Sequence, residues 1–550
     1  MDYDVIYDVI LIHPPAIYDF RNKPLFAGPL GGTVANAQLT KIPLGMMSIA
    51  DYLDRHGYKV LVDNLADRMV SSKAFDAEGH LRNVSARIYG IGLHFQQHSQ
   101  GAIEVAKLCK KLHPDSLVIL GGLTATYFHE EIVLKFGFVD AVIRGEAEKP
   151  FLKLIRTLEN HGRITTTPNL TYRTDTGKIC VTPLMKQSVN LDEFDFTRFD
   201  LLEPKTSIFT PNAEPRYSLT VCRGCIYNCI TCGGSAYSYR TYLGMEKPAF
   251  RSPRKIVEDI QRLSEQGIQF ISLFQDPRMG GEKYWRELMA ALRREKLDIV
   301  CLTMDIFTPA DEEFIREVAT IGKQVILFIC PDSGAYDVRK LQGRPYSNED
   351  LLRTVKLCHK YHILVTVFFA VGLAGETHET IRETWDLWDK LCRLDQVALI
   401  QGNFRDISCR IPIGGPIIGP VILDPGSLAF DSPERYGYKL LFNNLEEYIK
   451  GLSAPSWHQW LNHETNLLDK DALIDLIFES VEYSTYQREK YGMYDKFQAA
   501  AERFKAKADM IAVDEVNRIM NLQDSAEREL RLKSLRGDIL DSLLGRGGRG

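Results

Sequence analysis

The stretch "CRGCIYNCITCGG", residues 222–234, holds four of the eleven cysteines of this chain. It follows "YSLTV" (217–221), an apolar alternation typical of a half-buried strand. Cys225, Cys229 and Cys232 have the spacing C-x3-C-x2-C. Three thiolates on one short loop can cap three irons of a cubane [4Fe-4S] cluster and leave the fourth iron open to a substrate or cofactor. The sequence therefore predicts a catalytic cluster rather than a four-thiolate electron carrier.

The same cysteines also allow a zinc site. With Cys222 included, the run reads C-x2-C-x3-C-x2-C, which contains two CxxC pairs. Zinc ribbons place a much longer spacer between such pairs, and three residues leave little room to fold both around one ion. We therefore favour the open-iron cluster, with Cys225, Cys229 and Cys232 as its ligands. Cys222 is a plain strand residue, a spare thiol near the cluster or a catalytic thiol.

Length and composition limit the class of protein. A chain of 550 residues is too long for one ordinary core, so two or three domains are expected. A net charge of -5 without a dense Lys/Arg run predicts no nucleic-acid partner. The apolar stretch 5–16 is short and carries Asp8, so we expect no membrane span. The odd number of cysteines and the acidic N-terminus favour a cytoplasmic protein.

The order of apolar segments predicts an α/β protein. Short apolar strands alternate with amphipathic helices in two series, which indicates parallel sheets built from βαβ units. We expect a Rossmann-like domain at 1–155, a linker at 156–215, a partial (β/α)6 barrel at 216–410 and a mostly helical region with a flexible tail at 411–550. The sixth barrel strand is expected at "QVALIQGNF" (396–404). Such sheets bind ligands at the C-terminal ends of their strands.

The thiol motif, its position after the first barrel strand and the six expected βα units resemble the radical S-adenosylmethionine (radical SAM) superfamily over about 216–410. This resemblance implies that SAM chelates the open iron and is split reductively to a 5′-deoxyadenosyl radical. An external electron donor such as flavodoxin or ferredoxin is implied as a partner. The family usually has an aromatic residue before the last cysteine, where this chain has Thr231. Tyr227 is a candidate to pack against adenine instead.

The resemblance also implies SAM contacts from the barrel strand ends. Besides the glycines that follow the last cysteine, the candidates lie in "FQDPRMGG", "CPDSG", "LQGRPYSNEDLL" and "FFAVGLAGET". They are Gly233, Gly234, Gln275, Asp276, Ser333, Arg344 and Gly372. Each has a structural alternative, as loop geometry or a helix cap; "SNED" has the form of a capping box.

The first domain resembles that of the cobalamin-dependent radical SAM class. The resemblance rests on "VILGGLTATY" (118–127) and "VIRGEAEKPF" (142–151), in which glycines let backbone approach the corrin. The implied cobalamin contacts are Gly121, Gly122, Thr124, Ala125, Glu146, His98 and Ser99. The D-x-H-x-x-G loop of free-standing cobalamin proteins is missing, which is usual in this class, where cobalt often has no lower ligand from the protein. His94 or His98 as that ligand, a flavin-binding domain and a vestigial docking domain stay open as alternatives.

The resemblance implies a C-methyltransferase that acts on a small molecule or natural product. In that hypothesis an unactivated carbon of the substrate receives a methyl group from methylcobalamin after the 5′-deoxyadenosyl radical removes a hydrogen atom. A radical cyclase or rearrangement enzyme on the same scaffold is the second hypothesis. A non-enzymatic metal-binding or redox module is the third.

Overall fold

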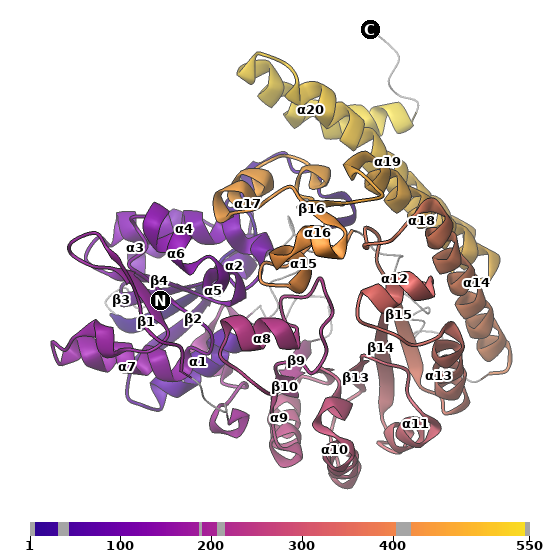
Figure 1. The fold of residues 1–550 in the computed structure, drawn as a ribbon, viewed down its shortest axis with the longest axis horizontal. Coiled ribbons are helices and arrows are strands. Elements are labelled where there is room, and N and C mark those ends of the chain that lie inside the picture. The colour runs from indigo at the N-terminus through magenta and orange to yellow at the C-terminus, as the bar shows by residue number, and fades with distance from the viewer. Residues whose placement is uncertain (1–5, 31–42, 186–189, 206–214, 403–419, 545–550) are drawn as a thin grey trace.

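A computed structural model describes residues 6–30, 43–185, 190–205, 215–402 and 420–544. Its N-terminal α/β domain, central barrel and C-terminal helical region pack around a shared middle (Figure 1). This arrangement confirms the α/β fold class expected from the sequence. The described part of the chain contains no helix that is long and apolar enough to cross a membrane.

The first domain is a doubly wound sheet whose strand order reverses in its middle. Five parallel strands have the order β2-β1-β3-β4-β5. They are β1 (Tyr7–His13), β2 (Val60–Asn64), β3 (Ala86–Gly92), β4 (Leu117–Gly121) and β5 (Ala141–Ile143). The helices are α1 (Leu44–Asp54), α2 (Leu65–Ser71), α3 (Ala77–Asn83), α4 (Ser99–Leu112), α5 (Leu123–Tyr127), α6 (His129–Lys135) and α7 (Glu148–Glu159). The loops after β1 and β3 diverge at the reversal, which opens a ligand crevice there.

The segment 156–215, expected as a linker, contributes strands to this first sheet. β6 (Leu170–Arg173) and β7 (Ile179–Val181) extend it beyond β5 as an antiparallel hairpin, and β8 (Leu202–Glu203) pairs with β2 at the other edge. These strands are therefore part of the first domain. The sequence did not reveal this because edge pairing is set by contacts far apart in the chain.

Over the residues that the structure describes, the central domain is a partial barrel of five parallel strands. They have the order β15-β14-β13-β12-β9 and span β9 (Arg216–Thr220), β12 (Phe270–Phe274), β13 (Cys301–Ile306), β14 (Gln324–Asp332) and β15 (Leu364–Phe369). The covering helices are α9 (Pro253–Glu265), α10 (Glu282–Arg294), α11 (Glu312–Ala319), α13 (Asn348–Lys360) and α14 (His378–Ile400). Alternate strand residues are buried against these helices, and the others line the half-exposed inner face.

The expected sixth strand at 396–404 is not formed over the residues that the structure describes. Residues 396–400 are the last turns of α14, and 403–404 lie outside the described ranges. Thr377 caps the start of this helix with a capping box, and the regular hydrogen bonding continues through Val397 to Ile400. Tertiary context thus overrides the β-preference of a short apolar run.

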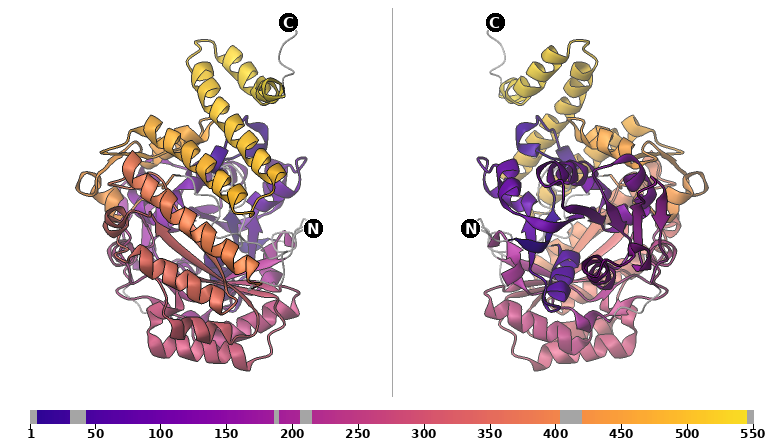
Figure 2. Two further views of the ribbon diagram at one scale, coloured as in Figure 1. Left: turned by 90° about the vertical axis from the view of Figure 1, so that its right-hand side faces the viewer. Right: turned by 90° about the vertical axis from the view of Figure 1, so that its left-hand side faces the viewer.

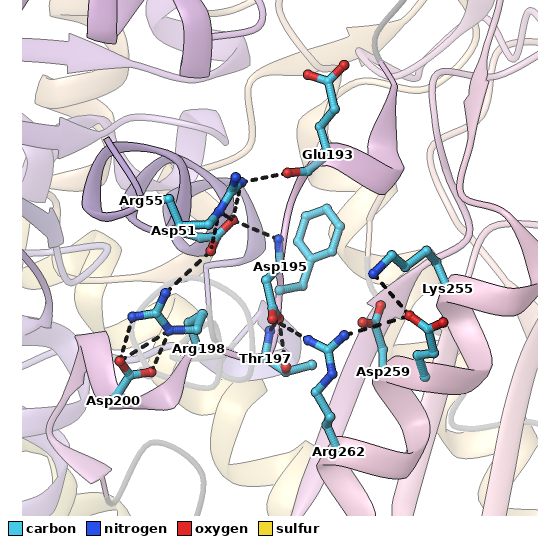
Figure 3. A network of polar contacts seen from close by, with 12 residues as sticks. Asp51, Arg55, Glu193, Asp195, Thr197, Arg198, Asp200, Lys255, Asp259 and Arg262 are labelled. Carbon is cyan, nitrogen blue, oxygen red and sulfur yellow. Dashed lines mark hydrogen bonds and ion pairs between the residues drawn. The ribbon is translucent and has the colours of Figure 1, made fainter. Parts of the chain in front are cut away.

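A polar network joins the two α/β domains through the connector (Figure 3). Asp51 of α1 accepts from the backbone N–H of Asp195 at 2.9 Å. The Asp195 carboxylate in turn forms an ion pair with Arg262 of α9. Arg198 adds an ion pair to Asp54 at 2.8 Å. The connector therefore fixes α1 of the first domain against α9 of the barrel.

The C-terminal region is mostly helical, as expected. It contains α15 (Leu428–Asp431), α16 (Pro433–Tyr436), a β16–β17 hairpin (Tyr438–Leu440 and His463–Thr465), α17 (Leu445–Leu452), α18 (Lys470–Lys490), α19 (Lys496–Met520) and α20 (Ser525–Leu543). The end of α19 and all of α20 project from the body (Figure 2). Trp457 and Trp460 are both buried, so they act as packing residues.

Candidate active site

The cysteine loop begins where the first barrel strand ends. After β9, the short strand β10 (Cys222–Arg223) pairs with β11 (Ala249–Phe250), and the loop then runs to α8 (Ala236–Tyr242), which Ser235 caps. Cys222 is buried, and its thiol contacts the carbonyl of Gly224 at 3.5 Å. Pairing in β10 thus turns Cys222 into the interior, whereas the next three cysteines lie in the open loop.

The thiols of Cys225, Cys229 and Cys232 lie in a common environment. Cys225 and Cys229 are half-buried and Cys232 is exposed. Surrounding protein raises the pKa of all three, and the charge of Asp424 and then those of the other two thiolates raise the pKa of Cys232 further. Backbone N–H groups point at two sulfurs, from Tyr227 to Cys225 at 3.4 Å and from Gly234 to Cys232 at 3.3 Å. Such N–H···S contacts are those that stabilise cluster thiolates.

The four-thiolate zinc site is not formed. In the described ranges, no three His, Cys, Asp or Glu side chains converge closely enough to hold one metal ion. Cys222 is also turned away from solvent. Cys225, Cys229 and Cys232 are the cysteines of this loop that are not fully buried, and three thiols are the donor set that the predicted iron–sulfur group needs.

Arg344 lies beside this thiol group. Its guanidinium forms an ion pair with Asp332 at 2.8 Å and hydrogen-bonds the carbonyl of Cys330. Burial alone would lower the pKa of Arg344, but the charges of Asp332, Cys229 and Cys330 raise it, so it stays cationic. Asp332 has φ of 64° at the end of β14, which aims its carboxylate at Arg344. Arg344 thus lies beside Cys229, and its role as a SAM contact stays a prediction.

Of the other expected SAM contacts at the second and fourth strands, Asp276 and Ser333 already have protein partners for their side chains, and Gln275 has one for its backbone N–H. The Asp276 carboxylate is buried, pairs with Arg278 at 2.7 Å and accepts from the N–H of Phe307 at 2.8 Å. Gln275 has φ of 82°, and its N–H donates to Asp305 at 3.1 Å. The hydroxyl of Ser333 is buried and accepts from the N–H of Ala335 at 3.1 Å. As SAM contacts these three stay predictions.

The sequence did not indicate Glu376 as a site residue, although its carboxylate contacts the predicted Gly372. It is fully buried, and it accepts from the N–H of Gly372 at 2.7 Å through one oxygen. Its other oxygen has no hydrogen-bond partner among the described residues. Burial raises the pKa of Glu376 to about 7. The signal in the sequence was "GLAGE", an acid on a glycine turn after an apolar strand.

The inner face of the barrel sheet offers a second set of groups. Thr303 and Thr366 have buried hydroxyls that lack a partner within the described structure. Phe274, on β12, is 46% exposed, and Phe328 packs edge-on against Phe368 with ring centroids 5.7 Å apart. This face thus combines aromatic surface with polar groups that a ligand can satisfy, as in other small-molecule sites.

The loop after β3 is held in place by residues that were predicted to contact cobalamin. They are Gly121, Gly122, Thr124 and Ala125. A Cβ on Gly122 (φ 114°) would lie 2.6 Å from the carbonyl oxygen of Leu93, so only glycine fits. The N–H and hydroxyl of Thr124 both donate to the carbonyl of His94 at 3.1 Å, and Ala125 donates to Leu93. These contacts bring the β3 and β4 loops together at the ligand edge of the sheet.

The β3 loop itself fits a polar cofactor. The hydroxyl of Ser99 and the amide oxygen of Gln97 are buried and lack hydrogen-bond partners in the described chain. Buried polar atoms are normally satisfied, so these two mark where a polar ligand belongs. His98 is buried against His13, with ring centroids 5.3 Å apart, and burial lowers its pKa well below the usual range.

Glu146 has a different environment from the one expected. Its carboxylate forms an ion pair with Arg223 of β10, which also pairs with Glu148 at 2.7 Å and donates to Ser48 at 2.8 Å. Arg223 immediately precedes the cysteine loop. Glu146 therefore joins the first domain to the barrel, and its role as a cofactor contact stays a prediction.

Asp424 of the C-terminal region lies between the two sets of loops. It accepts from the N–H of Gly233 at 2.9 Å, and burial raises its pKa to about 6. The side chain of Gln96, on the β3 loop, lies next to the same carboxylate. The cysteine loop and the ligand edge of the first sheet therefore border one region.

Comparison with known families agrees with this geometry. The model of the Radical SAM superfamily matches residues 219–387, and that of the B12 binding domain matches residues 31–155. The first match contains the three loop cysteines, and the second contains the β3 and β4 loops. These two domains account for the three cofactors, a [4Fe-4S] cluster, SAM and cobalamin.

Three curated relatives are similar to parts of the chain. An uncharacterized methyltransferase of Pyrococcus horikoshii is 24% identical over 64% of this chain and 73% of its own length. Hopanoid C-3 methylase of Methylococcus capsulatus is 30% identical over 41% of each chain. An anaerobic magnesium-protoporphyrin IX monomethyl ester cyclase of Rubrivivax gelatinosus is 23% identical over 51% of this chain and 50% of its own. The match spans only about half the length of the last two.

A solved structure shares the whole architecture. The radical S-adenosylmethionine methyltransferase TsrM of Kitasatospora setae, with cobalamin and a [4Fe-4S] cluster bound, aligns with a TM-score of 0.59 at 15% identity. The alignment covers 92% of this chain and 99% of that one. Because both family models match and the loops fit the cofactors, this chain belongs to the radical SAM superfamily as a cobalamin-dependent enzyme.

Proposed function

We propose that this enzyme methylates an unactivated carbon of a small molecule or natural product. When bound, the cluster with SAM supplies a carbon-centred radical, and cobalamin supplies the methyl group. The observation that carries the proposal is that the cysteine loop and the β3 loop of the B12-binding domain border one region, joined by Asp424. A second SAM would supply the methyl group that cobalamin carries and leave as S-adenosylhomocysteine, so the substrate carbon must lie within reach of both cofactors.

The chain's own residues position the reactants and exclude water from them. Cys225, Cys229 and Cys232 hold the cluster, and Arg344 beside Cys229 presents a fixed cation to the carboxylate of SAM. The aromatic and threonine side chains of the inner barrel face bind the substrate body. The ion pairs of Arg223 with Glu146 and Glu148 hold the first domain against the barrel. This closed contact between the domains keeps water from the reacting carbon.

An anaerobic assay with SAM labelled in its methyl group, cobalamin and a reductant tests the proposal. We expect S-adenosylhomocysteine and 5′-deoxyadenosine to form together, with the label in a new carbon–methyl bond of the substrate. Cys225→Ala should form no 5′-deoxyadenosine while still taking up cobalamin, which serves as the matched control. Formation of 5′-deoxyadenosine with no labelled product across candidate substrates would refute methylation.

A radical cyclase is the second candidate, because one relative is an anaerobic magnesium-protoporphyrin IX monomethyl ester cyclase. In that case 5′-deoxyadenosine would form without matching S-adenosylhomocysteine, and the product would contain no label. The same assay therefore separates the two functions.

A further inference from the structure

His94 differs from the other histidines at the C-terminal edge of the first sheet, because it is exposed there. It follows β3, so it stands at the point where the strand order of the first sheet reverses. Open α/β sheets bind their ligands in the crevice at this reversal. The neighbouring His13 and His98 are buried against each other, whereas His94 is an exposed residue.

The backbone at this histidine is fixed by the next loop. Its carbonyl accepts two hydrogen bonds from Thr124, and the N–H of Leu93 donates to Gly121 at 2.8 Å. The missing side chain of Gly122 allows this approach, because a Cβ there would lie 2.7 Å from the Cα of His94. These contacts fix the Cα of His94 at the ligand edge of the sheet.

The ring nitrogens of His94 are available to a ligand. Within the described ranges no side chain or backbone group hydrogen-bonds either ring nitrogen. Its one ring contact is to Phe95, with centroids 4.4 Å apart. Neutral imidazole is a common protein ligand for transition metals.

The charge of Arg223 acts on His94, so the two residues lie near each other. Arg223 belongs to the barrel and precedes the cysteine loop, so His94 borders the seam between the two domains. The orphaned polar atoms of Gln97, on the same β3 loop, and of Ser99, at the start of α4, follow His94 in the chain. A cobalamin at this edge would be contacted by the loop from one side and would face the barrel with the other.

We propose that His94 is the axial ligand that the protein supplies to the cobalt of bound cobalamin. The ring nitrogen that does not bind cobalt carries the proton and is left for the amide side chains of the corrin or for solvent. An axial donor from the protein tunes the electronic properties of the metal. The proposal rests on the B12-binding domain, and it holds whether the enzyme methylates or cyclises its substrate.

The test is the electron paramagnetic resonance spectrum of the full chain loaded with unlabelled cob(II)alamin. Protein grown with ¹⁵N-histidine should show its axial nitrogen splitting as a doublet, and unlabelled protein as a triplet. His94→Ala should lose this splitting. Phe95→Ala, which changes the exposed ring next to His94, should keep it.

Three results would overturn the proposal. A triplet in the ¹⁵N-labelled protein would show that cobalamin's own benzimidazole is the ligand. Absence of nitrogen splitting would show that cobalt has no such ligand, and a doublet that survives in His94→Ala would assign another histidine, such as His98. The labelled wild-type spectrum needs no variant, so a misfolded variant cannot decide the outcome. Methylation assays are independent of this readout.

Discussion

At the scale of single residues, exposure separates four cysteines that the sequence crowds together. Strand pairing buries Cys222, while the loop leaves Cys225, Cys229 and Cys232 accessible to one another and to a cluster. The side chain of Cys222 is packed in the interior by the pairing of β10 with β11, so it does not lie in the open loop that carries the other three thiols. The structure therefore assigns the first cysteine to the core.

Alanine substitutions test this assignment. Cys225→Ala, Cys229→Ala or Cys232→Ala should each remove the visible absorbance of the iron–sulfur cluster after anaerobic reconstitution, because three ligands are the minimum for the open-iron cluster. Cys222→Ala is the matched control and should keep iron and sulfide near the wild-type ratio. Loss of the cluster in Cys222→Ala with retention in one of the others would contradict the ligand set.

Glu376 gives a pH-dependent prediction at the same scale. Burial raises its pKa from about 4.5 to about 7, so the folded protein holds a proton that the unfolded chain releases. Stability should therefore fall as the pH rises from 4.5 to 7, by ~3 kcal/mol at about 1.4 kcal/mol per pKa unit. Glu376→Gln should lack this loss, and its stability relative to wild type should be greater at pH ~8 than at pH ~5. The free energy of unfolding of the wild-type and Glu376→Gln apo-proteins is measured by chemical denaturation at several pH values. The same dependence on pH in both proteins would refute the prediction.

At the scale of elements, a two-residue strand connects the two cofactor domains. β10 places Arg223 between Glu146 and Glu148 of the first domain, and the rings of Phe194 and Phe196 lie 5.5 and 5.9 Å from its guanidinium. The element that precedes the cysteine loop is thus fixed by the B12-binding domain. Movement of one domain would disturb the cluster loop of the other.

Arg223→Met should leave both glutamates in a low-dielectric seam without their cation. Breaking a buried ion pair in this way costs about 3–5 kcal/mol. The triple variant Arg223→Met, Glu146→Gln, Glu148→Gln removes the uncompensated charges and should regain part of that stability. Equal melting temperatures for the single and triple variants would show that the charges do not determine the loss.

At the scale of the whole molecule, three regions meet at one carboxylate. Asp431 of α15 accepts hydrogen bonds from Tyr127 of α5 at 2.9 Å and from Tyr237 and Tyr242 of α8 at 2.9 and 2.6 Å. These elements belong to the first domain, the barrel and the C-terminal region (Figure 1). A single side chain thus connects the parts of the chain that surround the proposed site.

Asp431→Ala should loosen all three regions together. Hydrogen bonds to a charged group are each worth about 1.5–3 kcal/mol, so amide hydrogen exchange should accelerate in α5, α8 and α15 at once. Asp541→Ala, on the projecting α20, is the control and should leave these segments unchanged. Faster exchange confined to α15 would show that the carboxylate does not couple the domains.

Local patterns in the sequence determined much of this protein. The spacing of Cys225, Cys229 and Cys232 predicted the cluster, and the glycines at 121 and 122 marked the ligand edge of the first sheet. Both are local, since three ligands on one loop and a backbone that only glycine adopts can be recognised without knowing what packs nearby. The alternation of strands and helices predicted the order of the domains for the same reason.

Tertiary structure alone decided the rest. The burial of Cys222, the ion pair of Glu146 with Arg223, the orphaned oxygen of Glu376 and the helical state of 396–400 depend on residues distant in the chain. Burial, pKa and charge pairing are set by neighbours that only the folded chain brings together, whereas ligand spacing and glycine turns are properties of consecutive residues. The sequence thus determined which cofactors this enzyme binds, and the fold decided which side chains are free to reach them.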